Sequence, residues 1–347
     1  MVTTWENYLT RPDAARAHRD CYLRCRRTFE SQRDCIRRLF ETTRPKVVAC
    51  LGAGMLNDLP YRAFVESGAT IYLVDWLPGV VESGVAHSII RHTGSGPPQC
   101  VYCLCGEADA RAYCHNYRKS RMSAQGMCNR FVPDARAPLT CLAFHKGDLP
   151  FIYLQDVTGG YASAFGRGVC GEVRTVTSWR QAFRRASALA NRVKKQRTTM
   201  DIPDASVDLV TSSMVISQFE HEPYDYFSKQ AAAVLGPPSP GEKNRLRPAM
   251  EVLRSTLLAN QIERHLDEIE RILAPGGHCF MAFETFHVEE GTGRWFLVRE
   301  MHGALAAIAR RFDFNFDMLP HSDSATLFEP PGGRSVVQRF VLQAMGR

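Results

Sequence analysis

Two glycine turns, one near each end of the chain, most constrain how this sequence can fold. The first, LGAG at residues 51–54, follows the apolar run 47–51 and precedes a helix-like stretch. The second, LAPGG at 273–277, ends a long amphipathic segment and leads into the apolar run 279–283. Glycine lets the backbone approach a ligand closely, and a helix N-terminus offers its unpaired N–H groups. The two turns predict a doubly wound α/β domain with a ligand at the carboxyl ends of its strands.

The other apolar runs and helical periodicities supply the remaining elements of such a domain. Helices are predicted at 12–43, 58–66, 177–193, 248–273 and 295–312. Strands are predicted at 46–51, 70–74, 151–155, 207–210 and 279–283, with two closing strands at 314–319 and 335–343. Cys170 falls between these elements, in a segment that the glycines predict to be a loop.

Residues 92–141 interrupt the alternation of strands and helices. They are rich in Cys, Gly and Pro, and they separate the second predicted strand from the third by more than the usual loop length. The predicted organisation is a helical cap at 1–45, an α/β domain formed by 46–91 and 142–347, and a Cys-rich insertion at 92–141.

The cysteine spacing in the insertion suits a tetrahedral zinc site. A thiolate pair two residues apart, followed by two further ligands, is typical of structural zinc. The predicted ligands are Cys100, Cys103, Cys114 and Cys128, with Cys105 and His115 as substitutes. The alternative is a loop of buried thiols that binds no metal.

Composition places the chain in a broad class. Charged residues at 23% and hydrophobic residues at 45% are ordinary for a globular protein. No apolar run approaches the roughly 20 residues of a membrane helix, and the first residues lack the pattern of a secretory signal. We therefore expect a cytoplasmic location without a membrane partner, and 12 cysteines that serve as thiols or metal ligands.

The formal net charge of +7 is partly concentrated in one segment. Between residues 174 and 197 there are eight basic residues and no acidic one. An apolar stripe at helical spacing runs through the same segment, which indicates that the charged side chains lie on the solvent-exposed face of a helix. Because no aromatic-rich platform accompanies them, nucleic-acid binding is not expected.

Two carboxylates end predicted strands. Asp75 ends the second strand, 21 residues after Gly54, and is placed to accept hydrogen bonds from ribose hydroxyls. Asp156 ends the third strand, within reach of an adenine amino group. A nicotinamide-binding turn would have glycine at position 57, where this chain has asparagine. The order of turns, carboxylates and strands resembles that of the class I S-adenosylmethionine (SAM)-dependent methyltransferases, over roughly 46–91 and 142–345.

The resemblance implies a mostly parallel, seven-stranded sheet whose last strand is reversed, with SAM as cofactor. Gly52 and Gly54 would face its methionine and sugar, and Asp75 would hold the ribose. Asp58 would contact the cofactor or cap a helix. The expected cofactor-binding residues are Gly52, Ala53, Gly54, Asp58, Asp75, Trp76, Asp156 and Val157 beside adenine, and Ser212 and Ser213 near the sulfonium.

The segment 218–226 follows the fourth predicted strand, where such a fold builds its acceptor site. His221 is a candidate general base because imidazole titrates near neutrality, and Tyr224 is placed to orient an acceptor. Glu284, just past the fifth strand, is a further catalytic candidate. The alternative for 218–226 is a solvated helix start with Pro223 in its first turn.

These observations predict a SAM-dependent methyltransferase that acts on O, N or S of a small-molecule acceptor. Such a reaction depends on alignment of the two reactants and requires neither a nucleophilic triad nor a catalytic metal. Three alternatives stay open: an RNA or other polyanion methyltransferase, an NAD(P)-dependent oxidoreductase on a similar sheet, and a non-enzymatic metal or redox sensor.

Overall fold

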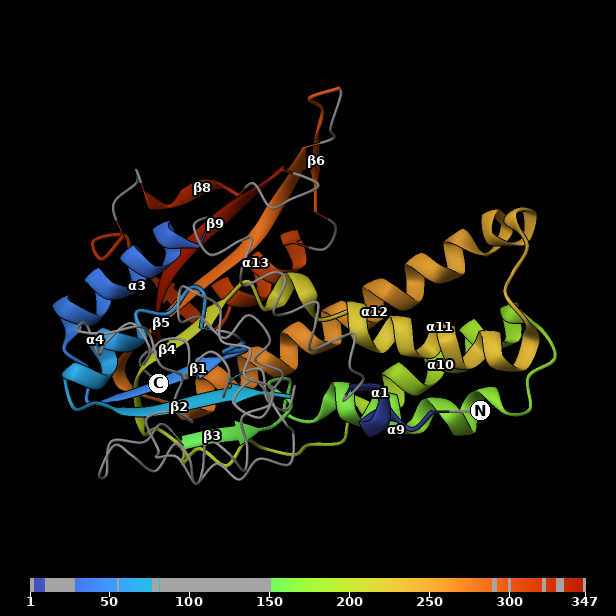
Figure 1. Cartoon of the computed structure of the whole chain (residues 1–347), viewed down its shortest axis with the longest axis horizontal. Helices are drawn as coiled ribbons and strands as arrows, with labels where there is room; N and C mark the ends of the chain where they lie inside the picture. Colours follow the sequence, from blue (N-terminus) through green and yellow to red (C-terminus); the bar gives the residue numbers. More distant parts are fainter. Residues whose placement is uncertain are drawn as a thin grey trace, which may run out of the picture. The chain divides into compact units, whose positions relative to one another are not determined.

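The computed structural model describes residues 3–9, 29–54, 56–76, 81, 151–288, 292–298, 301–319, 323–328 and 334–345 (Figure 1). The chain divides into two compact units, one formed by Thr10–Leu154 and the other by Met1–Leu9 with Gln155–Arg347. The predicted insertion lies outside the described residues, together with Cys100, Cys103, Cys105, Cys114, His115 and Cys128.

The unit Thr10–Leu154 is built on three parallel strands in the order β3-β2-β1. The apolar runs that predicted β1 and β2 form strands whose side chains are mostly buried, as parallel sheets require. Of the predicted helix 12–43, residues 12–28 lie outside the described part. The elements are α3 (Glu30–Thr43), β1 (Val47–Leu51), α4 (Tyr61–Glu66), β2 (Thr70–Asp75) and β3 (Phe151–Leu154).

The second unit contains the remaining strands. β4 pairs with β5 in parallel, and β9 lies antiparallel between β5 and β7. The last strand is therefore reversed, as the resemblance implies. Two short strands beyond the predicted seven, β6 and β8, pair with β5 and β9. The strands are β4 (Val207–Ser213), β5 (Leu273–Val288), β6 (Trp295–Leu297), β7 (Phe312–Phe314), β8 (Ala325–Phe328) and β9 (Arg334–Ala344).

A helical layer extends from the strands of this second unit. In Figure 1, α9, α10, α11 and the N-terminal half of α12 lie side by side, and the other half of α12 leads directly into β5. At 33 residues, α12 is about 50 Å long. The helices are α1 (Trp5–Leu9), α9 (Tyr161–Val173), α10 (Trp179–Val193), the short 3-10 helix η2 (Ile216–Gln218), α11 (His221–Leu235), α12 (Pro240–Ile272) and α13 (Met301–Ala309).

The LAPGG turn joins α12 to β5 as the sequence predicts. Gly276 has a φ of +77°, which glycine adopts without strain. A Cβ on Gly277 would lie 2.9 Å from the carbonyl of Ala274 and 3.0 Å from that of Val207. The register between β4 and β5 shifts at this point, so the turn forms an irregularity at the start of β5.

Several predicted elements were wrong in type or extent. The run 295–312 is not one helix, because Trp295–Leu297 pairs with β5 as a hairpin strand after the left-handed Gly293. The strand predicted at 314–319 lies earlier, at Phe312–Phe314. The segment around Cys170 is helix α9 and not a loop. α12 begins at Pro240, eight residues before the predicted start, because Ser239 caps it and Pro248 is accommodated inside it.

The glycines that suggested a loop at 161–173 have a packing role instead. A Cβ on Gly166 would lie 2.2 Å from the Trp5 ring, and one on Gly168 would lie 2.8 Å from Leu189. Glycine in α9 therefore allows neighbouring side chains to approach the helix backbone. None of the described helices combines the length and apolar character that crossing a bilayer requires.

Candidate functional site

The glycine turn after β1 folds over the carboxyl end of β2. The N–H groups of Gly52 and Ala53 donate to the carbonyl of Val74, at 2.8 and 3.0 Å. The N–H of Gly54 donates to Oδ2 of Asp75 at 3.0 Å. Asp75 is only 8% exposed. The turn and the carboxylate that the sequence singled out are therefore one hydrogen-bonded unit.

The same turn contains strain and an unpartnered polar atom. Leu56 has a φ of +56°, a conformation that costs a side-chain-bearing residue about 1–2 kcal/mol. The buried Oδ1 of Asn57 has no hydrogen-bond partner among the described residues. Left-handed residues and orphaned polar groups concentrate at ligand sites. Asp58 is buried close by, and Trp76 follows β2 directly and is half-buried.

Asp156 is engaged by its own turn. Its Oδ1 accepts from the N–H and the hydroxyl of Thr158, and its Oδ2 accepts from the N–H of Ser163 at 2.8 Å. Both carboxylate oxygens thus stabilise the entry into α9. An adenine contact from this side chain stays a prediction, because it requires at least one of these bonds to be shared.

A buried histidine that the sequence reasoning missed joins two of the predicted cofactor-binding residues. Nε2 of His265 lies 2.8 Å from Oγ of Ser212, and Nδ1 lies 2.9 Å from the carbonyl of Val157. A carbonyl only accepts, so Nδ1 carries the proton and Nε2 accepts from the Ser212 hydroxyl. Burial lowers the pKa of His265 to about 4, which keeps the ring neutral. Phe219 packs edge-on against it, with ring centroids 5.1 Å apart.

The sequence does contain a signal for this histidine. Leu258, Ile262, Ile269 and Ile272 form the buried stripe of α12, at spacings that place His265 among them. A lone polar residue on an apolar stripe must find buried partners.

The carboxyl end of β4 has a second strained position. Met214 has a φ of +61°, and its N–H donates to the carbonyl of Ala282 at 2.7 Å. Ser213 is 7% exposed, and its Oγ has no hydrogen-bond partner in the described part of the chain. Ser212 and Ser213 therefore differ, because among the described residues Ser212 has a hydrogen-bond partner and Ser213 has none.

The three catalytic candidates lie on different elements of the second unit. His221 is exposed at the first residue of α11, and Pro223 occupies the first turn of that helix. Oε1 of Glu284, on β5, accepts from the hydroxyl of Ser335 at 2.8 Å. Over the described ranges, no hydrogen bond joins Glu284 to His221 or Tyr224. Each role stays a prediction.

Tyr224 belongs to a small cluster with a cation. Burial raises the pKa of Tyr224, while the nearby Arg254 opposes this shift and Glu220 adds to it. The Arg254 guanidinium lies 4.9 Å from the Tyr224 ring centre and pairs with Glu220 at 2.6 Å. The tyrosine hydroxyl therefore stays protonated near neutral pH.

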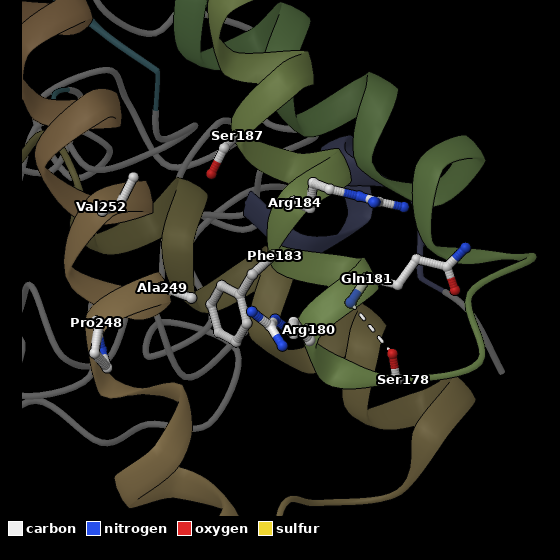
Figure 2. A pocket seen from close by; sticks show the side chains of 9 residues that line it. All are labelled: Ser178, Arg180, Gln181, Phe183, Arg184, Ser187, Pro248, Ala249 and Val252. Carbon is white, nitrogen blue, oxygen red and sulfur yellow. Dashed lines mark hydrogen bonds between the residues drawn. The ribbon is translucent and has the colours of Figure 1, made fainter.

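A groove of about 690 Å³ lies between α10 and α12 (Figure 2). Figure 2 shows the Phe183 ring pointing toward Ala249 of α12. Arg180 and Arg184, one helical turn apart, make no ion pair with any residue that the structure describes. The lining residues are Ser178, Arg180, Gln181, Phe183, Arg184, Ser187, Pro248, Ala249 and Val252.

Within the described ranges, no group of three or more His, Cys, Asp or Glu side chains is arranged to hold a metal ion. The predicted zinc ligands Cys100, Cys103, Cys114 and Cys128 are not among those residues, so the zinc site stays a prediction.

No protein-family model and no curated protein matches the chain. Solved structures do. The chain is similar to SAM-dependent methyltransferases of known structure. One, from Methanosarcina mazei, is 7% identical with a TM-score of 0.37, over 87% of this chain and 93% of the other. The arsenic(III) SAM methyltransferase of Chlamydomonas reinhardtii is 14% identical with a TM-score of 0.31, over 86% and 64%.

The YcgJ protein of Bacillus subtilis is 9% identical with a TM-score of 0.34, over 89% of this chain and 99% of its own. These values describe a distant likeness, and the function proposed below rests on the residues of this chain.

Proposed function

We propose that this protein is a SAM-dependent methyltransferase acting on a small-molecule acceptor. The observation that supports this most is the hydrogen bond from Gly54 N–H to Asp75, which folds a side-chain-poor turn against a buried carboxylate. A nucleoside needs such a pair: open backbone for close approach and a carboxylate for the ribose hydroxyls. The orphaned Oδ1 of Asn57 in the same turn fits a ligand that supplies a donor.

The chain's own residues would bind and align the reactants. Asp75 would hold the sugar, and the glycine turn would lie against the methionine portion. The unpartnered hydroxyl of Ser213 is available to the ligand at the end of β4. The bound cofactor would supply an activated methyl group on a sulfonium. Transfer then depends on alignment in a site that excludes water, with His221, Tyr224 or Glu284 as candidates to take the acceptor proton.

Calorimetry with SAM and with S-adenosylhomocysteine tests the cofactor. We expect both to bind the wild-type protein, and Asp75→Ala to weaken binding about thirtyfold through loss of a charge-assisted hydrogen bond. Asp34→Ala is the matched control, since Asp34 is a half-exposed aspartate of the same unit whose one ion-pair partner among the described residues is its helical neighbour Arg37. Thermal unfolding of each variant separates lost binding from lost folding.

No affinity of the wild-type protein at millimolar SAM, or equal affinity after Asp75→Ala, would contradict the proposal. Binding of NADH in place of SAM would favour the oxidoreductase. Incubation with methyl-labelled SAM and a cell extract then identifies the acceptor, because mass spectrometry shows which fraction gains the label.

A polyanionic acceptor is the second candidate, and the groove between α10 and α12 favours it. Two guanidinium groups, Arg180 and Arg184, have no acidic partner among the described residues and attract phosphates, and such binding weakens steeply as salt rises. If RNA is the acceptor, label enters the RNA fraction and Arg180→Glu with Arg184→Glu abolishes the transfer. Lys194→Glu with Lys195→Glu is the control, because these exposed residues lie outside the groove. Label confined to small molecules excludes this candidate.

A further inference from the structure

Two adjacent serines at the carboxyl end of β4 have different surroundings. Ser212 is fully buried, and its hydroxyl bonds to His265. Ser213 is nearly as buried, and its hydroxyl has no partner among the described residues. Successive side chains on a strand point to opposite faces of the sheet, so the two hydroxyls lie on opposite faces of β4. Of the two, the Ser213 hydroxyl is the one without a partner in the described ranges, so we take it as the hydroxyl available to a ligand.

The partner of Ser212 also holds the segment after β3. The Nδ1–H of His265 donates to the carbonyl of Val157 while Nε2 accepts from Ser212, so both nitrogens of the ring are used. Arg264, the neighbouring residue on α12, donates to the carbonyl of Gly159 at 2.9 Å. Consecutive residues of one helix thus fix two carbonyls of the same loop. His265 is 0% exposed, so no solvent competes for these bonds.

We propose that His265 is a positioning residue that holds Val157 and Ser212 in a single arrangement, and that Ser213 supplies the hydroxyl that contacts the bound SAM. This inference rests on the proposed function, in which the Ser213 hydroxyl is available to the cofactor, and on the sequence-based expectation that Val157 lies beside adenine. A bridge with one fixed tautomer pre-organises both segments before the ligand arrives. Ser212 then affects SAM binding through its hydrogen bond to His265, whereas Ser213 contacts SAM itself.

Two substitutions of His265 separate its contacts. In His265→Asn, the amide N–H lies near the position of Nδ1, so the bond to Val157 is kept and the bond to Ser212 is lost. In His265→Gln, the amide oxygen lies near the position of Nε2, so the bond to Ser212 is kept. We expect each to raise the Kd for SAM about tenfold, and the control His278→Gln, a half-buried histidine on β5, to leave it unchanged.

Double-mutant cycles on the Kd distinguish positioning from general destabilisation. Ser212→Ala and His265→Asn remove the same bond, so the double variant should bind SAM no more weakly than the weaker single variant. Ser213→Ala acts at another contact, so its loss of affinity should multiply with that of His265→Asn. Melting temperatures measured in parallel identify any variant that is simply unfolded. Multiplying effects for Ser212 with His265→Asn, or an unchanged Kd after Ser213→Ala, would overturn the inference.

The tautomer can be read without any cofactor. Nitrogen-15 NMR of the histidine ring should show a protonated Nδ1 and an unprotonated Nε2 at neutral pH. The opposite tautomer, or a charged ring, would contradict the proposed hydrogen bonds of His265 with Val157 and Ser212, whatever the protein binds. Failure of the wild-type protein to bind SAM would instead remove the proposed function and leave the NMR result to decide the bridge alone.

Discussion

Burial determines which form of the His265 imidazole is stable. The ring has no access to solvent, and the pKa of the native ring is about 4, against 6.5 for an ordinary histidine. Below pH 6.5 the unfolded chain therefore binds a proton that the native protein does not bind. We expect the free energy of unfolding to be highest above pH 6.5 and to fall as the pH drops toward 4, by at most about 3 kcal/mol.

Urea unfolding at about pH 7.5 and about pH 4.5 measures this difference. His265→Asn lacks the titrating ring, so its stability should fall less over the same interval. Equal losses for the variant and the wild-type protein would show that other groups account for the acid sensitivity.

Single residues could be predicted from the sequence where the local pattern fixes their place. Asp75 ends an apolar strand, so its position at the carboxyl edge followed directly. The partners of His265 could not be predicted, because they lie 53 and 108 residues away in the sequence. The occupation of Asp156 by its own turn was likewise not visible, since any aspartate at a strand end is able to bind a ligand or cap a helix.

At the scale of elements, α12 holds a loop through a row of polar side chains. Glu268, 3% exposed, accepts from the N–H of Met200 at 3.0 Å and from Arg271 at 2.8 Å. Arg271 also donates to the carbonyls of Met200 and Ile202. The loop after α10 is therefore held by one buried carboxylate and one guanidinium.

Removing the charge of Glu268 should destabilise the protein. Glu268→Gln leaves Arg271 without its buried counterion, and we expect a loss of about 2 kcal/mol in the free energy of unfolding. The other acidic partner of Arg271 is Asp204, whose side chain is 76% exposed. Asp204→Asn should therefore lower the free energy of unfolding by less than about 0.5 kcal/mol. Chemical unfolding of both variants tests the contrast, and similar losses would contradict it.

Two glycines of α9 should respond to alanine in opposite directions. Gly166→Ala places a methyl group 2.2 Å from the Trp5 ring, and we expect it to destabilise by about 2 kcal/mol by displacing that ring. Gly171→Ala meets nothing within 4 Å and should stabilise by about 0.5 kcal/mol through helix propensity. Thermal unfolding measures both, and a stabilising Gly166→Ala would contradict the packing role.

Elements were predictable where hydrophobic period and caps agreed. The stripe of α10 and its Ser178 cap place that helix within two residues of its predicted start. Strand β6 falls inside the predicted helix 295–312, because Trp295 and Phe296 are apolar although they are 58% and 50% exposed. In a three-residue edge strand, pairing with β5 determines the conformation, and no period is long enough to reveal it.

At the scale of the molecule, the reactivity of the four cysteines in the described ranges should follow their burial. Cys35, Cys50 and Cys279 are at most 4% exposed, and burial raises the pKa of Cys279. Cys170 is half-buried, with its sulfur 3.0 Å from the hydroxyl of Tyr226. We expect iodoacetamide to modify Cys170 before the other three in the native protein, because thiol reactions need access and ionisation.

Peptide mass spectrometry at timed intervals gives the order of modification. In urea Cys35, Cys50, Cys170 and Cys279 should react at similar rates, which serves as the control. Native modification of Cys279 as fast as Cys170 would contradict the burial order.

The α/β class and the order of the seven predicted strands followed from the sequence, whereas the pairings of the short strands β6 and β8 did not. Parallel strands buried on both faces leave long apolar runs, which made β1, β2 and β4 visible. The pairing of β8 with β9 depends on contacts that no local pattern encodes. The helical layer was only partly predicted, because the glycines in the sequence of α9 are typical of a loop.

The contacts of the first residues have a consequence for how the chain is made. The carbonyl of Thr3 accepts from Tyr226 and Gln230, which follow it by 223 and 227 positions. During synthesis Trp5 and Tyr8 therefore leave the ribosome long before α11, whose Tyr226 packs against both rings. Until α11 is made, these apolar rings stay exposed to solvent. Contacts of such long range form late and slow folding. We expect a bulky tag fused at this end to delay maturation more than one at the opposite end.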